Sequence, residues 1–279
     1  MFGVLHTLIL LAVLLLLNEV FRKYKWATLV FFLVIPIVLT PLIWIKTGNT
    51  PGSSINTWFH WAKLYSVIIA VLGFTAFRYT KLDSSKFMKF FPALILAVNI
   101  AEAVGRDFEL GFAAPAQYWH FFNAIAGILS IITISGWSGI YADHANPKRD
   151  MLWPDMTTLW IIAYDVWNLV YIWFCVPEHA GFGIAVLLSC TIPSLWIKKG
   201  TWIQARAFTL AAWMMYLFTF NGFVDNAANR VMLPTNPGLM VFLGLLSLGL
   251  NGAFAWIHFS KMLKKKSFKL GDEVHTTAA

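Results

Sequence analysis

Hydrophobic residues occupy this chain in long runs, and short polar segments separate the runs. Nine runs have roughly the 20-residue length of a helix that crosses the hydrocarbon core of a bilayer. They cover residues 2–20, 26–46, 56–77, 87–106, 119–140, 156–176, 180–197, 203–224 and 238–262. The connecting segments, such as "KTGNTPGSS" and "ADHANPKRD", are rich in turn-forming residues and too short to form a further domain. The pattern therefore predicts a bundle of membrane-spanning helices.

The basic residues follow these runs in an alternating pattern. Of the 21 lysine and arginine residues, 17 follow the first, third, fifth, seventh and ninth runs. The other four are Lys46, Lys63, Arg106 and Arg230. Loops that remain in the cytoplasm carry an excess of Lys and Arg. The pattern predicts nine spans, with the N-terminus outside and the C-terminus inside.

The composition agrees with a membrane setting. The chain has 279 residues, of which 59% are hydrophobic and 12% are charged, whereas a soluble domain has about 25% charged residues. Its net charge of +8 follows from the basic loops, so it does not indicate a nucleic-acid-binding surface. We predict an all-α, polytopic transmembrane helix bundle. One transmembrane domain covers residues 1–262, and a short basic cytoplasmic tail covers residues 263–279.

Polar side chains recur inside several runs, at the midplane or in the outer half of the predicted bundle. The fourth run ends in "NIAEAVGRDFE", which places Asn99 and Glu102 on one helix face. An ionisable side chain at membrane depth costs at least a few kcal/mol, so it must face protein or water. The candidate residues for binding a ligand or ion are His60, Lys63, Glu102, His120, Asn123, Asp165, Asn168, Asn221 and Asp225.

Two arrangements of these side chains fit the pattern. In the first, they line a water-filled outer vestibule, with Lys63 and Asp165 paired at its floor and Glu102 and Asp225 in its upper wall. In the second, they form separate polar contacts that hold helices together, such as Glu102 with Arg106 four residues later. Polar faces at the same depth on five helices favour the vestibule. The residues expected at the membrane interface are Arg106, Asp107 and Glu109.

Several segments resemble a known group of proteins. The strings "LLNEVFRKYKW", "NIAEAVGRD", "MLWPDMTTLWIIAYDVWN" and "FNGFVDNAANR" are similar to segments of a family of uncharacterised bacterial polytopic membrane proteins. The resemblance implies a bacterial inner-membrane location and a multi-pass topology. It implies no activity and assigns no functional residue.

Three classes of function remain open. The mixture of acids, bases and amides at depth favours a transporter or channel-like protein for a small ion or polar solute. The alternatives are a membrane-embedded enzyme that acts on a lipid or lipid-linked substrate, and a receptor or structural subunit. The sequence contains no phosphate-binding loop or "HExxH" metal motif, so we expect no cofactor and no metal. The expected partners are the lipid bilayer and the solute, and the deep aromatic residues favour a cation.

The predicted topology can be tested by labelling. A cysteine placed at Asn49 is expected to react with an impermeant thiol reagent added outside, because the second predicted span ends there. A cysteine placed at Ser84 is expected to stay unlabelled in intact cells. The reverse labelling pattern would contradict both the orientation and the outer vestibule.

Overall fold

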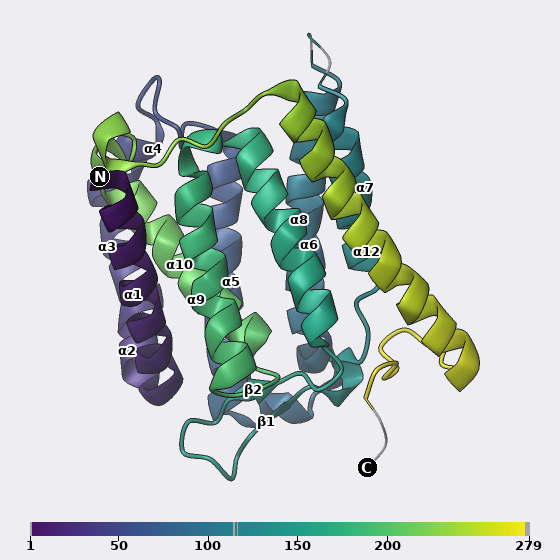
Figure 1. Cartoon of the computed structure of the whole chain (residues 1–279). Coiled ribbons are helices and arrows are strands. Elements are labelled where there is room, and N and C mark those ends of the chain that lie inside the picture. The colour runs from purple at the N-terminus through teal and green to yellow at the C-terminus, as the bar shows by residue number, and fades with distance from the viewer. Residues whose placement is uncertain (1, 114, 116, 277–279) are drawn as a thin grey trace.

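A computed structural model describes residues 2–113, 115 and 117–276, and it is a bundle of long helices (Figure 1). The long helices are α1 (Phe2–Lys23), α5 (Trp58–Tyr79), α6 (Lys86–Gly111), α7 (Trp119–Ile132), α8 (Thr158–Cys175), α9 (Ala180–Trp196), α10 (Trp202–Thr219) and α12 (Pro237–Lys265). One further helical segment combines α2 (Lys25–Leu29), η1 (Val30–Val34), α3 (Ile35–Leu39), η2 (Thr40–Trp44) and α4 (Ile45–Gly48). The short elements are η3 (Lys81–Ser84), η4 (Trp137–Gly139), β1 (Tyr141–Ala142), β2 (Met151–Leu152), η5 (Pro177–His179), α11 (Asn221–Val224) and η6 (Ala227–Asn229).

Seven helical segments of the described chain are long and apolar enough to cross a membrane. They are α1, Lys25–Gly48, α5, α6, α8, Pro177–Trp196 and α12. The all-α class is therefore confirmed. Helices α7 and α10 coincide with two further predicted runs, but α7 has only 14 residues and α10 contains Gln204 and Arg206. Nine spans and the orientation of the termini stay predictions.

The fifth predicted run is helical over only part of its length. We expected a span over residues 119–140, but α7 ends at Ile132. The chain then turns at Gly136, whose φ of 67° lies in the left-handed region that favours glycine. A Cβ atom at this position would lie 2.1 Å from the Cβ of Asp155. The chain has therefore left the helix before this turn, and the turn keeps the rest of the run from continuing as a span.

Two π-helical turns interrupt the segment Lys25–Gly48. The first, η1, precedes Pro36, and the second, η2, contains Pro41. Proline has no N–H group, and its ring clashes with the carbonyl four residues earlier. The wider π turn is one local adjustment that keeps such a helix continuous.

Helix α10 lies inside the bundle. None of its residues, Trp202–Thr219, is exposed, and it packs against α1, α5 and α9. In Figure 1, α1 to α3 lie on one side of the bundle, and α7 and α12 lie on the opposite side. Helix α12 packs against α7 and α8. Helix α10 therefore lies between α1 and α5 and contacts both of them.

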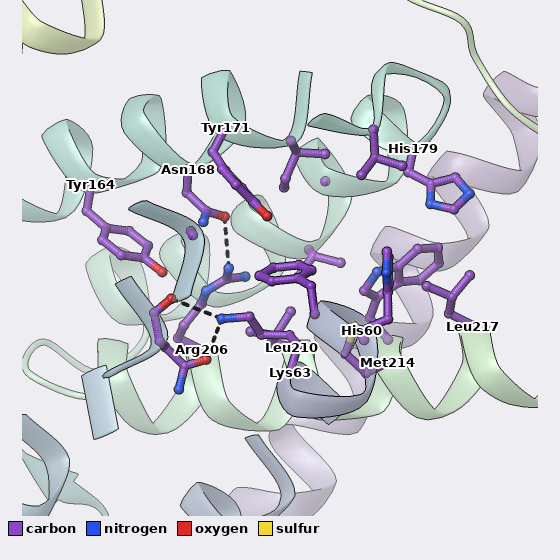
Figure 2. Close-up of a pocket in the computed structure, with 18 residues that line it drawn as sticks. His60, Lys63, Tyr164, Asn168, Tyr171, His179, Arg206, Leu210, Met214 and Leu217 are labelled. Carbon is purple, nitrogen blue, oxygen red and sulfur yellow. Dashed lines mark hydrogen bonds between the residues drawn. The ribbon is translucent and has the colours of Figure 1, made fainter. Parts of the chain in front are cut away.

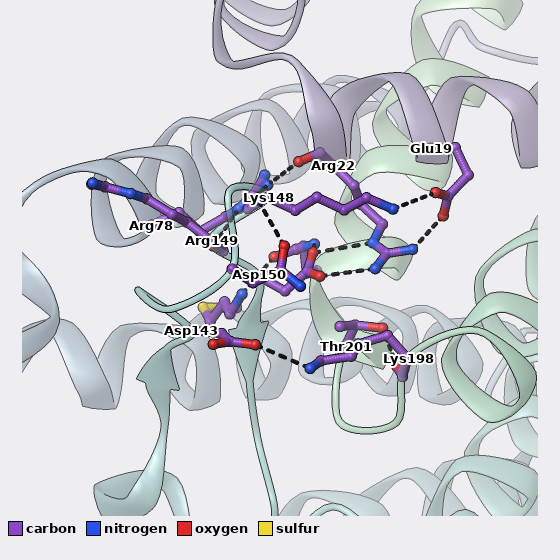
Figure 3. Close-up of polar contacts among 12 residues, drawn as sticks. Glu19, Arg22, Arg78, Asp143, Lys148, Arg149, Asp150, Lys198 and Thr201 are labelled. Atoms are coloured by element: carbon purple, nitrogen blue, oxygen red, sulfur yellow. Dashed lines mark hydrogen bonds and ion pairs between the residues drawn. The ribbon is translucent and has the colours of Figure 1, made fainter.

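A network of charged side chains joins the loops at the end of the bundle that carries β1 and β2, which we call the hairpin end (Figure 3). Arg22 donates two hydrogen bonds to the carboxylate of Asp150, at 3.0 and 2.8 Å, and also pairs with Glu19. Gln204 donates a further bond to Asp150, at 2.9 Å. Arg78 is fully buried and donates to the backbone carbonyl oxygens of four residues. These residues are Phe21, Arg22, Lys148 and Arg149.

The chain beyond α12 returns to the bundle at the same end. The carboxylate of Asp155 accepts hydrogen bonds from the backbone N–H groups of Val274, His275 and Thr276, at 2.6–3.1 Å, and from the hydroxyl of Ser135. Burial raises the pKa of Asp155, but these hydrogen bonds outweigh burial, so the pKa is lowered overall. The carboxylate is therefore ionised at neutral pH and holds the last described residues of the tail in place.

The Asp150 network predicts a difference between two carboxylates at this end. Asp150→Asn is expected to lower the free energy of unfolding by about 3–5 kcal/mol, because it removes the buried counter-ion of Arg22 and leaves only the partly exposed Glu19. Asp143→Asn is the matched control, since its pair with Lys198 is partly exposed and contributes about 1 kcal/mol or less. Unfolding in detergent, followed by circular dichroism, measures both. Equal losses in the two variants would contradict the assigned role of Asp150.

Candidate functional site

A cavity of about 90 Å³ lies between α5, α6, α8, α9 and α10 (Figure 2). Its wall is largely aromatic and aliphatic, and two cationic side chains, Lys63 and Arg206, form part of it. The polar residues that line it are His60, Lys63, Asn99, Tyr164, Asn168, Tyr171, His179 and Arg206. None of the described residues in this lining carries a carboxylate.

Helix α5 supplies Lys63, and α6 supplies its partners. The ammonium nitrogen lies 2.7 Å from the Glu102 carboxylate. It also donates to the side-chain oxygen of Asn99, at 2.9 Å, and to the backbone oxygen of the same residue, at 3.0 Å. Asn99 and Glu102 are three residues apart, so one face of α6 presents both groups. Lys63 thus lines the cavity, whereas its counter-ion, Glu102, lies outside the cavity lining.

The second cation, Arg206, comes from α10. Its Nη2 donates to the side-chain oxygen of Asn168 on α8, at 2.9 Å, and its guanidinium lies 5.9 Å from the ring centre of Tyr164. The Nε and Nη1 atoms are buried and have no hydrogen-bond partner among the described residues. The hydroxyl of Tyr171, in the same lining, is also buried without a described partner. Unsatisfied buried donors carry a free-energy cost, so these groups are suited to an incoming acceptor.

Two histidines line the end of the cavity farther from the hairpin end, and a carboxylate outside the lining contacts one of them; we call these residues and their polar partners the closing group. His60 contacts the hydroxyl of Thr57 through Nδ1, at 2.7 Å. His179 contacts Asp225 through Nε2, at 3.1 Å, and Ser54 donates two further bonds to Asp225, at 2.7 and 3.0 Å. Burial raises the pKa of Asp225, but the hydrogen bonds from His179 and Ser54 lower it to about 2 overall. Asn221 joins this group through the hydroxyls of Ser53 and Ser54.

A separate polar cluster lies between α6, α7 and α8. Asp107 accepts from Asn123, at 2.8 Å, and its other oxygen lies 2.7 Å from Nδ1 of His120. Asn123 in turn accepts from Ser247 on α12, at 2.7 Å. Asp107, His120 and Asn123 are all fully buried. Because its polar groups bond mainly to one another, this cluster joins helices and lies apart from the cavity lining.

Asp107, His120 and Cys175 also bring three possible metal-binding atoms within 4.8 Å of one another. The separation between Oδ1 of Asp107 and Nδ1 of His120 is 2.7 Å, which is a hydrogen-bond distance. Two such ligands of one tetrahedral zinc ion lie about 3.3 Å apart. The observed geometry therefore fits a hydrogen-bonded pair better than a pair of metal ligands.

The structure separates the nine candidate residues into four groups. His60, Lys63 and Asn168 line the cavity, and Glu102 lies behind Lys63. The closing group contains Asn221 and Asp225, and the cluster with Asp107 contains His120 and Asn123. Asp165 accepts from Thr191 on α9, at 2.6 Å. Whether these residues bind a ligand remains a prediction.

Three expectations about charged residues differ from the structure: two concern ion pairs, and one concerns burial. The partner of Lys63 is Glu102 rather than Asp165, because Glu102 and Asn99 lie on the α6 face that meets α5. Arg106 pairs with Glu109 at 2.7 Å rather than with Glu102. Asp107, expected at the membrane interface, is fully buried because it faces α7.

Sequence reasoning missed Arg206 and His179 as cavity residues. Arg206 counted as one of the basic residues of a loop, although the string "WIQARAFTLAAW" places it one turn inside an apolar run. Its position inside an apolar run was the signal that could have identified Arg206 as a buried residue. His179 lies in a short connecting segment, and only the tertiary structure turns it toward the cavity.

The seven apolar helices and the buried polar sites between helices define the class of this protein, a multi-pass helical membrane protein. The chain belongs to a family of unknown function, DUF5692, whose model matches residues 1–279. This agrees with the resemblance to an uncharacterised family. No curated protein and no solved structure matches the chain.

The ion pair at the cavity generates a stability prediction. Glu102→Gln is expected to lower the free energy of unfolding by about 3 kcal/mol, because Lys63 then lacks a counter-ion in a largely buried position. Glu109→Gln is the control, since the Glu109 side chain is 51% exposed and an exposed pair contributes about 1 kcal/mol or less. Thermal unfolding in detergent compares the two variants.

A double variant distinguishes the loss of the Lys63–Glu102 ion pair from other effects of the substitution at Glu102. Glu102→Gln combined with Lys63→Met is expected to recover part of the loss, because no charge is then stranded. If the two single changes simply add, Lys63 and Glu102 do not stabilise each other.

Proposed function

We propose that this protein binds a small anion in the cavity and carries it across a bacterial inner membrane. One observation carries the proposal: Lys63 and Arg206 line one cavity whose described lining has no carboxylate. Glu102, the counter-ion of Lys63, and Asp165 both lie outside that lining. A cation would meet the Lys63 ammonium, which Glu102 balances, and the Arg206 guanidinium, which has no ion pair among the described residues. The sign of the ligand therefore differs from the one that the aromatic content of the sequence favoured.

The free donors favour a carboxylate or another oxyanion. Two nitrogens of the Arg206 guanidinium are unpartnered, and a guanidinium can hold two oxygens of one carboxylate side by side. The hydroxyl of Tyr171 offers a third donor. Charge-assisted hydrogen bonds of this kind are stronger than neutral ones, which supports recognition of the charged end of the ligand.

The volume of the cavity limits the size of the ligand. An enclosed water molecule needs about 10–15 Å³ of cavity volume. The cavity of 90 Å³ therefore accommodates roughly six to nine water-sized groups. The aromatic rings of Phe59, Tyr171 and Trp213 form part of the wall. We therefore propose a small monocarboxylate with a short apolar portion.

A layer of four side chains supports a carrier rather than an open channel. Asn99, Tyr164, Arg206 and Leu210 line the cavity and also a second cavity of about 30 Å³. The rest of the second cavity is lined by apolar residues such as Phe74 and Leu96. Passage of an anion requires this layer to move, which is expected of alternating access. In the proposed topology the larger cavity lies in the outer half of nine spans, with the N-terminus outside.

Fluorescence titration tests the proposed binding. Acetate and benzoate are expected to change the emission of Trp213 in the purified protein, and tetramethylammonium is not. Arg206→Gln is expected to raise the Kd for benzoate about 10- to 100-fold, because one charge-assisted interaction of about 1.5–3 kcal/mol is lost. Arg230→Gln, outside the cavity lining, is the matched control and leaves Kd unchanged. Trp213→Phe is expected to remove the signal.

Two outcomes would contradict this function. Equal binding of tetramethylammonium and benzoate would remove the preference for an anion. Benzoate binding without any uptake of radiolabelled benzoate into proteoliposomes would leave a binding protein instead of a carrier.

A further inference from the structure

An apolar groove lies on the other side of α10 from the cavity. It has a volume of about 410 Å³ and runs between α1, the segment Lys25–Gly48 and α10. Its lining is hydrophobic along most of its length, with residues such as Leu14, Phe31 and Met215. Such a groove does not retain water, because water there would have no polar partners.

The polar residues of the groove gather at one end. His6 contacts the hydroxyl of Tyr216 through Nε2, at 2.9 Å, and the backbone oxygen of Asn229 through Nδ1, at 2.8 Å. Thr219 lies in the same lining. His6, Tyr216 and Thr219 lie near the first residues of α1 and the last residues of α10. These helix ends are on the side of the bundle opposite the hairpin end (Figure 1). The groove is therefore polar where a membrane helix meets the headgroup layer, and apolar farther in.

The length of the groove matches one leaflet. Its lining on α1 runs from His6 to Leu17, and eleven steps of 1.5 Å give about 16 Å. Half of a hydrocarbon core of about 30 Å is about 15 Å. The whole empty space of the groove, about 980 Å³ with its open side included, gives over this length a mean cross-section of about 60 Å², which is less than the roughly 80 Å² of a helix 10 Å wide. The groove is too narrow for another helix and wide enough for a hydrocarbon chain.

We infer that the groove is a binding site for one acyl chain of a bilayer phospholipid, with its headgroup near His6 and Tyr216. The helices that form its open side support this occupant. Only 22% of the apolar window of α1, and the same share of Lys25–Gly48, is buried within the protein. Both segments therefore leave most of their apolar surface uncovered by the protein, which suits contact with lipid. A chain in the groove fills space that would otherwise be empty and contacts α10 directly. This inference does not depend on the identity of the ligand in the cavity.

Photo-crosslinking tests this site, because α10 has no exposed residue that bulk lipid could reach. The full chain is reconstituted in phosphatidylglycerol vesicles that contain a phosphatidylglycerol with a diazirine in the middle of one acyl chain. After irradiation, peptide mapping is expected to show adducts on α10, at Ala212, Met215 or Tyr216. Adducts confined to exposed positions such as Ile37, which is 65% exposed, would overturn the inference.

Variants that fill the groove complete the test. Ala212→Phe is expected to abolish the adducts on α10, and Ile37→Phe, on a lipid-facing surface outside the groove, is expected to leave them unchanged. If Ala212→Phe does not fold, Val13→Trp fills the groove from an exposed position instead. Adducts on α10 that persist in a folded, filled variant would show that the chain reaches α10 by another route, which overturns the proposal. Benzoate binding to the same samples reports separately on the cavity.

Discussion

Cationic side chains inside apolar helices need partners that the protein itself supplies, and the arrangement around the cavity depends on this constraint. Lys63 finds a carboxylate and two oxygen atoms on one face of α6. Arg206 finds the amide oxygen of Asn168, and two of its nitrogens have no described partner. Inside a bilayer there is no bulk water to replace a missing contact. Helices α5, α6, α8 and α10 therefore meet where these groups meet, and Arg206, which is incompletely bonded, lines the cavity.

At the hairpin end, the buried cations have the partners that this constraint requires. Arg78 donates to four backbone oxygens, and Arg22 is held by Asp150 and Glu19. These bonds join the ends of α1 and α5 to the loop that holds the hairpin. The contrast between the two sites is physically informative. A satisfied buried cation rigidifies the structure, whereas a cation with free donors retains the capacity to bind an anion.

Helix α10 connects the two proposed sites. One of its faces carries Arg206 and Trp213 into the cavity, and the opposite face carries Ala212 and Met215 into the lipid groove. A helix with no exposed residue transmits a displacement on one face to the packing on the other, since protein interiors have few voids. Occupancy of the groove by a lipid chain would in this way support the wall of the cavity.

The sequence by itself determined the class of protein. The apolar runs are long enough to identify membrane-length helices without knowledge of their neighbours, because a bilayer imposes that length locally. It also identified most of the buried polar residues, since an ionisable group such as Lys63 within an apolar run is conspicuous. The tertiary structure decided which of these residues meet. Helical periodicity gives the face on which a side chain lies, but it does not give the helix that the face contacts. For that reason Lys63 pairs with Glu102 instead of Asp165, Asp107 is buried against α7, and Arg206 lines the cavity instead of a loop.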